Sequence, residues 1–408
     1  MSTLGAAAPR VLVIRDTRES GEMLEAALSA GVASAGGEAL LGGILPTPAA
    51  PLLLRRYGFD LAAVLSASHN PFEDNGIKFF GADGNKLSDA SELAIEQGLE
   101  GGPAGRAGTG RIRALHGTLD DYLRALAERF STLDLSGLDV LLDCANGATF
   151  RAAPEIFRRL GASVTTLADA PDGRNINLDS GSTHVERLAE AVLAGGHHVG
   201  FAFDGDGDRV LAVDRIGAVV DGDELIALAA LHLREARRLP GNGVAVTVMT
   251  NYGFHAAMRE AGIEVATTAV GDRYVLEELL RRGWALGGEQ SGHVIELGFA
   301  PSGDGIASAL LTLEALRGSD LADRAAMEKL PQRLVNVRVR DRRAAQQAPP
   351  VRGAIEREQR GLEGRGRVLV RPSGTEALVR VMVEAPSAGE ADAVCGRLVD
   401  VVRAEAGE

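Results

Sequence analysis

The sequence has few cysteines, little positive charge and no long apolar run. Its two cysteines among 408 residues, Cys144 and Cys395, exclude a disulfide framework and a cysteine-rich metal site. This scarcity fits a reducing compartment. No apolar stretch approaches the length of a membrane span, and residues 1–10 lack the apolar centre of a signal peptide. We therefore expect a cytoplasmic protein that does not contact a membrane.

Basic residues are outnumbered, with 43 lysines and arginines against 56 aspartates and glutamates and a net charge of −13. This balance argues against nucleic-acid binding, and any anionic substrate would need a locally basic site. Lysine is the rarer base and occurs only at Lys78, Lys86 and Lys329. Because lysine can release its proton and arginine cannot, Lys78 is a candidate for proton chemistry. Chance is the alternative explanation.

The hydrophobic pattern predicts an α/β protein. The hydrophobic fraction of 45% is enough for a large core, and the length suggests roughly three domains. Short apolar runs alternate with helical patterns up to about residue 330, which predicts parallel sheets. The expected strands are 11–14, 40–44, 61–65, 77–80, 140–142, 163–167, 199–203, 244–248, 263–267 and 284–287. The expected helices are 20–35, 46–57, 119–130, 151–160, 185–194, 223–236, 253–261, 274–281 and 304–316.

The C-terminal part has a different pattern. Expected strands at 335–339, 367–371 and 377–384, with helices at 344–359 and 388–404, predict a smaller α+β domain. We predict four domains, residues 1–117, 118–218, 219–331 and 332–408, the first three being α/β units with mixed or parallel sheets. The glycine-rich residues 101–110 are expected to be irregular.

A polar loop follows the expected strand 61–65. It contains Ser66, Ser68, His69 and Asn70, and the ends of strands are where open α/β sheets place ligand chemistry. A serine beside a histidine is compatible with a nucleophile and its helper. The alternative is a polar turn whose hydroxyls cap the backbone, and this stretch alone favours the turn slightly.

Three carboxylates alternate with glycines directly after the expected strand 199–203. Asp204, Asp206 and Asp208 can fold round one hard cation. An EF-hand loop is excluded, because arginines stand where its glycine and glutamate would be. Three carboxylates leave places for phosphate or water, which is the usual Mg²⁺ arrangement in phosphoryl transfer. A solvated acidic turn is less favoured, because like charges this close repel one another.

Two further polar segments follow or join expected strands. Residues 371–376, Arg-Pro-Ser-Gly-Thr-Glu, combine a cation, hydroxyls and an exposed backbone, which suits an anion. An ordinary hairpin turn is as good an explanation. Residues 287–293 bring Glu289, Ser291 and His293 together, a set that suits sugar hydroxyls unless it is only a polar loop. Arg273 precedes a predicted helix, and we expect it to face the same cleft as Glu289, Ser291 and His293.

These four segments resemble those of the α-D-phosphohexomutase family in order and spacing, over nearly the whole chain. The family has a phosphoserine loop, a metal loop, a sugar-binding loop and a phosphate-binding loop, which residues 66–71, 204–209, 288–293 and 371–376 resemble in turn. The resemblance implies three α/β domains and a smaller C-terminal domain around a central cleft. Gln290, residues 270–275 and residues 143–148 are similar to the branch that acts on glucosamine phosphates.

The resemblance also implies roles for individual residues. Ser68 would carry the phosphoryl group, His69 would position it, and Lys78 and His293 would be the general acid/base candidates. One Mg²⁺ per chain would be held by a phosphoserine oxygen of Ser68 with Asp204, Asp206 and Asp208. The substrate would be bound by Glu289, Ser291, Arg209 and Arg273. The phosphate that is not reacting would be held by Arg371, Ser373, Gly374, Thr375 and Arg380.

The implied reaction is an isomerisation. Phosphate would pass from Ser68 to O1 of glucosamine 6-phosphate, and a hexosamine 1,6-bisphosphate would reorient and return its 6-phosphate to the serine, giving glucosamine 1-phosphate on the route to UDP-N-acetylglucosamine. A mutase for mannose or glucose phosphates is the closest rival, because the four segments are shared. The partner is a phosphorylated hexosamine rather than nucleic acid, and the resemblance is compatible with a homodimer.

One departure concerns the start of the chain. The family opens with a segment of the form Phe-Gly-Thr-Asp-Gly-Ile-Arg-Gly, and residues 11–21 resemble the family's next stretch, directly after that segment. The first strand of domain 1 and an arginine beside the phosphoserine are therefore expected to be missing. Either the natural start lies upstream, or the chain is truncated. Truncation makes a sugar-phosphate-binding protein without catalysis a second alternative.

Overall fold

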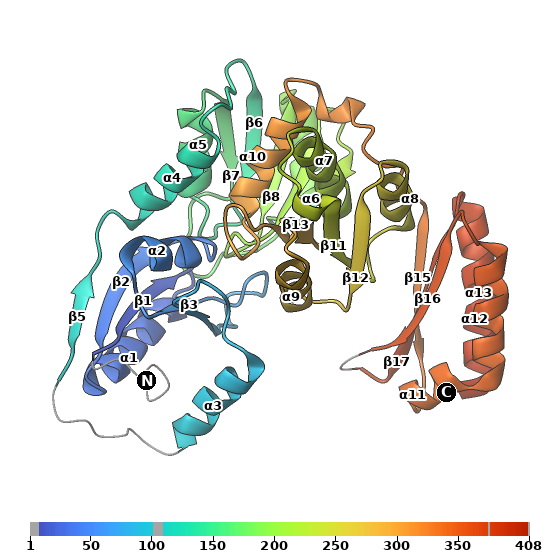
Figure 1. The fold of residues 1–408 in the computed structure, drawn as a ribbon, viewed down its shortest axis with the longest axis horizontal. Helices are drawn as coiled ribbons and strands as arrows, with labels where there is room; N and C mark the ends of the chain where they lie inside the picture. Colours follow the sequence, from blue (N-terminus) through green and yellow to red (C-terminus); the bar gives the residue numbers. More distant parts are fainter. Residues whose placement is uncertain (1–7, 101–108, 374–375, 407–408) are drawn as a thin grey trace. The chain divides into compact units, whose positions relative to one another are not determined.

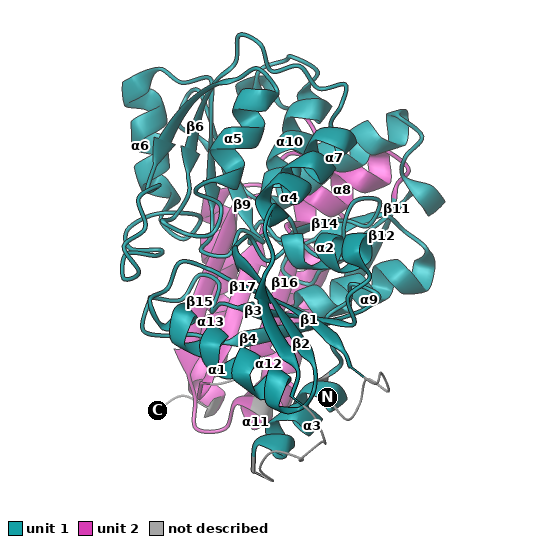
Figure 2. Cartoon of the chain, turned by 90° about the vertical axis from the view of Figure 1, so that its left-hand side faces the viewer, with its two compact units in different colours: residues 1–249, 264–324 teal, residues 250–263, 325–408 magenta. Residues whose placement is uncertain are grey.

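The computed structural model describes residues 8–100, 109–373 and 376–406. Strands and helices alternate over most of their length (Figure 1). The chain forms two compact units (Figure 2), one from residues 1–249 and 264–324 and the other from residues 250–263 and 325–408. The second unit therefore takes one short segment from the middle of the chain.

The first sheet of the larger unit is parallel except at one edge. Its order is β4-β3-β1-β2-β5, and β4 runs antiparallel to β3. The strands are β1 (Arg10–Arg15), β2 (Glu38–Ile44), β3 (Leu61–Leu65), β4 (Ile77–Gly81) and β5 (Arg111–Ala114). The helices are α1 (Ser20–Ser34), α2 (Ala49–Tyr57) and α3 (Asp89–Glu100). Apolar residues of β1 and β3 such as Leu12, Ile14 and Ala62 are fully buried, as their continuous apolar runs predict.

The second sheet repeats this plan, with the order β10-β9-β8-β6-β7 and antiparallel pairing only at β9 and β10. Its strands are β6 (Asp139–Asp143), β7 (Ser163–Leu167), β8 (Val199–Phe203), β9 (Val210–Asp214) and β10 (Val219–Val220). Its helices are α4 (Thr118–Arg129), α5 (Ala152–Arg159) and α6 (Val185–Gly195).

The third sheet has the order β12-β11-β13-β14, with β14 antiparallel to β13. Its strands are β11 (Gly243–Thr247), β12 (Glu264–Thr268), β13 (Leu286–Gly288) and β14 (Val294–Glu296). The helical segments are α7 (Gly222–Glu235), a 3₁₀ turn (Pro240–Asn242), α9 (Asp272–Arg282), α10 (Gly305–Leu316) and a second 3₁₀ turn (Leu321–Asp323).

Three loops occupy the same place in these three sheets. β3, β8 and β13 each pair parallel with a neighbour and are each followed by an antiparallel strand, β4, β9 or β14. The loop residues are 66–76, 204–209 and 289–293. Each predicted polar segment of the larger unit therefore follows the carboxyl end of a parallel strand, where α/β sheets bind ligands.

The smaller unit has an antiparallel sheet of order β15-β17-β16. Its elements are α8 (Tyr252–Glu260), β15 (Gln332–Arg338), α11 (Arg342–Gln347), α12 (Pro349–Gly361), β16 (Arg367–Pro372), β17 (Leu378–Glu384) and α13 (Ala388–Ala406). The fully buried Glu384 carboxylate pairs with Arg367 at 2.7 Å and accepts from the Tyr252 amide at 2.8 Å. This carboxylate ties the N-terminus of α8 to the sheet.

The structure confirms the α/β class and the smaller C-terminal domain. One predicted element is wrong, because the helix expected over 344–359 is two helices, α11 and α12. Ala348 between them has an extended conformation with ψ of 132°. It precedes Pro349-Pro350, and the residue before a proline is pushed out of the helical region.

Several elements are absent from the sequence-based prediction. These are α3, the short strands β5, β10 and β14, and β9, which begins directly after residues 204–209. β5 consists of Arg-Ile-Arg-Ala and is exposed throughout, so it lacks the apolar run that marks a strand. Most of the glycine-rich segment 101–110 lies outside the described residues. The four predicted domain boundaries and the central cleft stay predictions.

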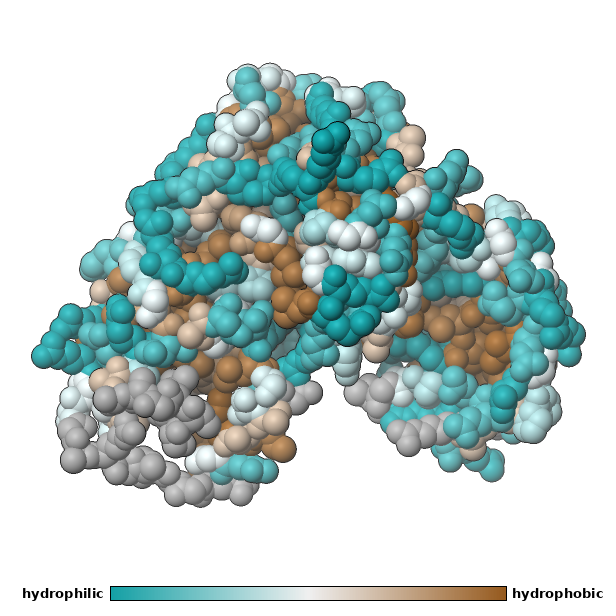
Figure 3. Space-filling view, viewed as in Figure 1, coloured by the Kyte–Doolittle hydropathy of each residue, from teal (hydrophilic) through white to brown (hydrophobic). Residues whose placement is uncertain are grey.

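Hydrophilic residues cover much of the face seen in Figure 3, and hydrophobic residues appear between them. Within the described ranges, every helix is too short or too polar to cross a bilayer.

A buried hydrogen bond joins α4 to the start of α10. The Tyr122 hydroxyl lies 2.9 Å from Asp304 Oδ2, and both residues are almost fully buried. Asp304 also caps α10 by accepting from the Ala307 amide at 2.9 Å. Burial raises the pKa of Asp304 to about 6, and the hydrogen bonds oppose that rise only in part.

Asp304 should therefore make stability depend on pH. The folded protein keeps the proton up to about pH 6, whereas the unfolded chain releases it near 3.8. Stability from this group is present below the unfolded pKa and is lost as pH rises through the folded pKa, by up to about 3 kcal/mol. Asp304→Asn cannot ionise, so its stability relative to the native protein should rise by that amount between about pH 4 and pH 7, measured by urea unfolding. Asp120→Asn, which changes a carboxylate with 70% of its side chain accessible, serves as the control. Parallel profiles for Asp304→Asn and the native protein would contradict the assignment.

Candidate functional site

The acidic loop gathers three buried carboxylates after β8. Asp204, Asp206 and Asp208 are each at most 4% exposed, and their ligand oxygens lie within 4.8 Å of one another. The two glycines between them serve different purposes. Gly207 has φ of +73°, which other residues rarely adopt, whereas a Cβ on Gly205 would lie 2.6 Å from the Ser68 carbonyl oxygen.

Hydrogen bonds satisfy only part of this triad. Asp206 Oδ2 accepts from Lys78 Nζ and from Thr47 Oγ1, each at 2.6 Å. Asp204 Oδ1 accepts from the Arg209 amide at 3.1 Å. Within the described part of the chain, the buried atoms Asp206 Oδ1 and Asp208 Oδ1 have no hydrogen-bond partner. Two buried anionic oxygens are thus left available to a further ligand.

The ionisation of the triad reflects this crowding. Burial, with repulsion from Asp208 and Asp206, raises the pKa of Asp204 well above its usual range. Burial alone would also raise the pKa of Asp208, but Lys78 and His293 outweigh it and hold that pKa well below the usual range. Burial lowers the pKa of Lys78, yet attraction to Asp206 and Asp208 raises it overall, so this lysine is a cation. Unpartnered carboxylate oxygens in such a field fit a hard divalent cation.

The serine loop after β3 points at this triad. Ser68 Oγ donates to Asp204 Oδ2 at 2.6 Å, although the two residues are 136 positions apart. Ser68 has φ of +52°, an uncommon left-handed conformation for serine. His69 Nδ1 lies 3.5 Å from Ser68 Oγ and 3.4 Å from Arg209 Nη1. Burial and then the charge of Arg209 lower the pKa of His69, which favours its neutral form.

His293 is buried in the loop between β13 and β14 and contacts the triad. Its Nε2 accepts from the Gly303 amide at 3.0 Å, which leaves Nδ1 as the nitrogen that bears a proton. Nδ1 lies 3.6 Å from Asp208 Oδ2. Both ring nitrogens are therefore engaged by the protein, and a proton exchange with a substrate would require one contact to break.

The other predicted sugar-binding residues lie in or near the same loop. Glu289 Oε1 accepts from the Gly271 amide at 2.9 Å, and the buried Ser291 Oγ has no partner within the described residues. Arg273 Nη2 donates to the Leu87 carbonyl at 3.0 Å. Asp272 does not cap α9, because Gly271 holds the cap position and Asp272 forms a short hydrogen bond with Lys86.

The predicted phosphate-binding residues belong to the smaller unit. Arg371 on β16 stands directly opposite Arg380 on β17 in the strand register. Burial, and then the charge of Arg380, lower the pKa of Arg371. Like charges directly opposite one another in a sheet destabilise it, so a bound anion would relieve this pair. Ser373 is buried beside them, and Gly374 and Thr375 lie outside the described residues.

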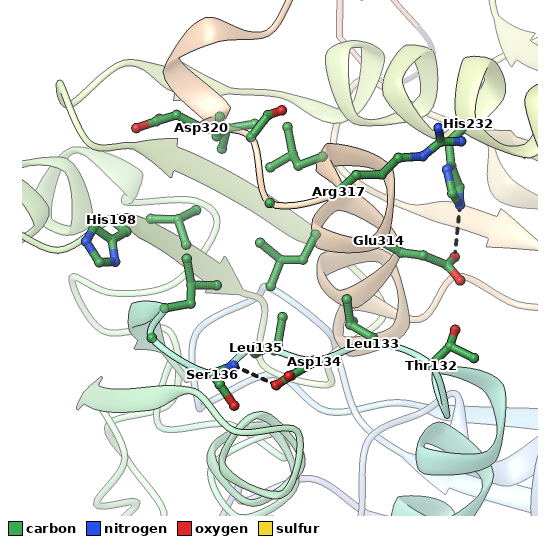
Figure 4. Close-up of a pocket in the computed structure, with 18 residues that line it drawn as sticks. Thr132, Leu133, Asp134, Leu135, Ser136, His198, His232, Glu314, Arg317 and Asp320 are labelled. Carbon is green, nitrogen blue, oxygen red and sulfur yellow. Dashed lines mark hydrogen bonds and ion pairs between the residues drawn. The ribbon is translucent and has the colours of Figure 1, made fainter.

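Cavity size alone does not locate the site. A cavity of about 760 Å³ is lined by residues 132–138, 313–314 and 316–321 with His198, Val199 and His232, and it includes none of the predicted site residues (Figure 4). A cavity of about 430 Å³ is lined by His293, Arg273, Asp272 and Lys86 among others. The second cavity therefore adjoins the candidate site.

Comparison with known proteins agrees with this geometry. Family models described as phosphoglucomutase/phosphomannomutase match in four consecutive stretches: α/β/α domain I over residues 1–104, domain II over 120–217, domain III over 221–334 and the C-terminal domain over 334–401.

Relatives match over most of their length. A phosphoglucosamine mutase of Desulforudis audaxviator is 52% identical over 403 residues, which cover 96% of this chain and 89% of the relative. One of Pelotomaculum thermopropionicum is 50% identical, with 96% and 90% covered. A crystal structure of a phosphoglucomutase/phosphomannomutase family protein of Burkholderia thailandensis has the same fold, with a TM-score of 0.81, 23% identity, and 98% of this chain and 91% of that chain covered. The four matching domains and the identity of about half the residues show that this chain belongs to the phosphoglucomutase/phosphomannomutase family of phosphohexomutases.

Proposed function

We propose that this chain interconverts glucosamine 6-phosphate and glucosamine 1-phosphate through a phosphorylated Ser68. The observation that carries the proposal is the 2.6 Å contact between Ser68 Oγ and Asp204 of the buried triad. The choice of an amino sugar rests on two relatives, 52% and 50% identical, that are named phosphoglucosamine mutase.

The proposed metal is Mg²⁺, one per chain. Asp204, Asp206, Asp208 and an oxygen of phosphorylated Ser68 would hold it. Asp206 Oδ1 and Asp208 Oδ1, which have no hydrogen-bond partner among the described residues, support this assignment. When bound, the ion would withdraw charge from the phosphoryl group and make the serine oxygen a better leaving group.

The protein's own residues would bind and orient the other groups. The bond from phosphorus to Ser68 Oγ breaks as a bond to the sugar O1 forms, and the sugar hydroxyl loses its proton. Lys78 and His293 stay the candidates for accepting that proton, and the cationic Lys78 would first have to release its own. The neutral ring of His69 would lie beside the phosphoryl group. Holding the reacting oxygen in place would supply much of the rate.

The sugar and the second phosphate need separate contacts. Ser291 Oγ, buried without a partner among the described residues, and the Glu289 carboxylate would bind sugar hydroxyls, with Arg209 and Arg273 contributing charge. Arg371, Ser373, Gly374, Thr375 and Arg380 would hold the phosphate that is not reacting. A hexosamine 1,6-bisphosphate must then exchange its two phosphates between these places. Both cysteines are free and buried, which supports a reducing, cytoplasmic setting.

Ser68→Ala should remove the phosphoryl carrier. We expect mutase activity to fall by at least about a thousandfold, because covalent catalysis is lost. Intact-mass analysis after incubation with hexosamine 1,6-bisphosphate should find one phosphate on the native chain and none on the variant. Ser34→Ala, which changes an exposed serine of α1, is the control. A native chain that is never phosphorylated would favour a sugar-phosphate-binding protein instead.

Asp206→Asn should weaken metal binding. The change removes one charge from the triad, so we expect the Kd for Mn²⁺, measured by electron paramagnetic resonance, to rise at least about tenfold. Asp120→Asn removes an exposed carboxylate with 70% of its side chain accessible and should leave the Kd unchanged. Equal Kd values for Asp206→Asn and the native protein would sink the metal assignment.

Substrate preference tests the amino-sugar assignment. We expect kcat/KM for glucosamine 6-phosphate to exceed those for mannose 6-phosphate and glucose 6-phosphate by at least about tenfold. Equal or better use of the other two sugars would identify a phosphomannomutase or phosphoglucomutase instead. The Ser68→Ala variant, assayed in parallel, gives the background for each sugar.

A further inference from the structure

Arg18 is fully buried beneath the serine loop, an unusual place for an arginine. It follows β1, and its guanidinium group has five N–H donors in a planar fork. Nε donates to Asp16 Oδ2 at 2.9 Å. Nη1 and Nη2 donate to backbone carbonyls of the serine loop. Those carbonyls belong to Ser68, Asn70, Pro71 and Asp74, so five acceptors match five donors.

Asn177 holds two of the same carbonyl oxygens from another part of the chain. Its Nδ2 donates to Ser68 O at 2.9 Å and to Asn70 O at 3.0 Å. Arg18 Nη2 reaches these atoms at 2.9 and 2.8 Å. Asn177 is 7% exposed and lies in the loop between β7 and α6. β7 belongs to the second sheet, and the acidic triad follows β8 of that sheet.

The supports of these two side chains are themselves fixed. Asp16, 1% exposed, balances the Arg18 charge and accepts from Ser66 Oγ at 2.6 Å. Ser66 Oγ in turn accepts from the Ser68 amide at 3.0 Å. On the other side, the Asn177 amide donates to the Ala145 carbonyl at 2.8 Å. Both peptide groups of Ser68 are thus held, its amide by Ser66 and its carbonyl by Arg18 and Asn177.

We propose that Arg18 and Asn177 are positioning residues for phosphoryl transfer at Ser68, an inference that rests on the proposed function. They turn the loop carbonyls inward, away from the reacting phosphoryl group, whose negative charge those oxygens would repel. They also stabilise the left-handed conformation of Ser68, at φ of +52°, which is strained for serine. That conformation directs Oγ to Asp204 Oδ2 at 2.6 Å.

The shared carbonyls also set the distance between two segments of the chain. Arg18 lies in the loop after β1 of the first sheet, and Asn177 lies in the loop after β7 of the second. The two shared oxygens therefore fix the position of the serine relative to the acidic triad. Gly205 of the triad loop leaves no room for adjustment, because an added Cβ would lie 2.7 Å from Asn177 Nδ2. A displacement of about 1 Å at a reacting atom can cost on the order of 100-fold in rate.

The experiment compares Asn177→Ala and Arg18→Lys with the native protein. Lysine keeps the charge but offers three donors without the planar fork. We expect kcat, and the single-turnover rate of phosphate transfer from hexosamine 1,6-bisphosphate to Ser68, to fall about 10- to 100-fold in both variants. KM should change by less than about threefold, and Mn²⁺ affinity should be unchanged, because the triad and the sugar-binding residues keep their contacts.

Asn175→Ala is the matched control, since among the described residues that side chain hydrogen-bonds to Ala170 and Asp172 of its own loop. It should keep native rates. Asn177→Ala with a transfer rate within about twofold of native would overturn the proposal. So would a loss of kcat that Asn175→Ala shares, or one accompanied by lost Mn²⁺ binding, because both would indicate a general structural role.

The native protein separates this inference from the function on which it rests. If the native chain neither gains phosphate at Ser68 nor turns over any hexose phosphate, the proposed function fails, and the positioning role fails with it. If the native chain is active and Asn177→Ala transfers phosphate as fast, only the positioning role fails. Should Arg18→Lys not fold, Asn177→Ala still decides the question.

Discussion

Repulsion among three buried carboxylates is the constraint on which the site depends. Asp204, Asp206 and Asp208 share a space in which their oxygens lie within 4.8 Å, and water is largely excluded from them. Lys78 binds one of them directly, and His293 lies close to another. The basic residues that offset this negative charge come from loops after three different strands, β3, β8 and β13, or from the strands paired with them. A shared electrostatic demand therefore brings together side chains that are far apart in sequence.

The electrostatic field of these carboxylates and their neighbours also gives the candidates for proton transfer different protonation states. Lys78 is held as a cation by the carboxylates around it, and His69 is held neutral by burial and by Arg209. His293 has a third situation, with one nitrogen on a backbone amide and the other facing Asp208. Three proton-bearing groups within one site thus differ in charge or in freedom, which is how proteins divide acid and base roles among neighbouring residues.

Much of this could be predicted from the sequence, and the remainder has physical reasons. The buried strands can be predicted from their apolar runs. The alternation of aspartate and glycine in residues 204–208 is typical of a loop that holds a cation. Thr47, Arg18 and Asn177 could not be found in this way, because they act on backbone oxygens or on single carboxylates that adjacency in sequence does not reveal. The sequence suggests a turn at Gly205, whereas the structure needs this glycine for close approach to Ser68. Pro349-Pro350 marks the break between α11 and α12, although the helical pattern runs across it, and β5 has no apolar pattern at all.

The path of the chain through the smaller unit affects how the protein can be divided. A fragment starting at residue 332 would contain every strand of the antiparallel sheet and would look complete on a sequence map. It would nevertheless lack α8, and Glu384 would lose the Tyr252 amide and keep Arg367 as its charged partner. Helix α8 therefore lies between two strands of the third sheet in the sequence, whereas in the fold it belongs to the smaller unit. Shuffling or grafting of the C-terminal module between related proteins would have to carry residues 250–263 with it.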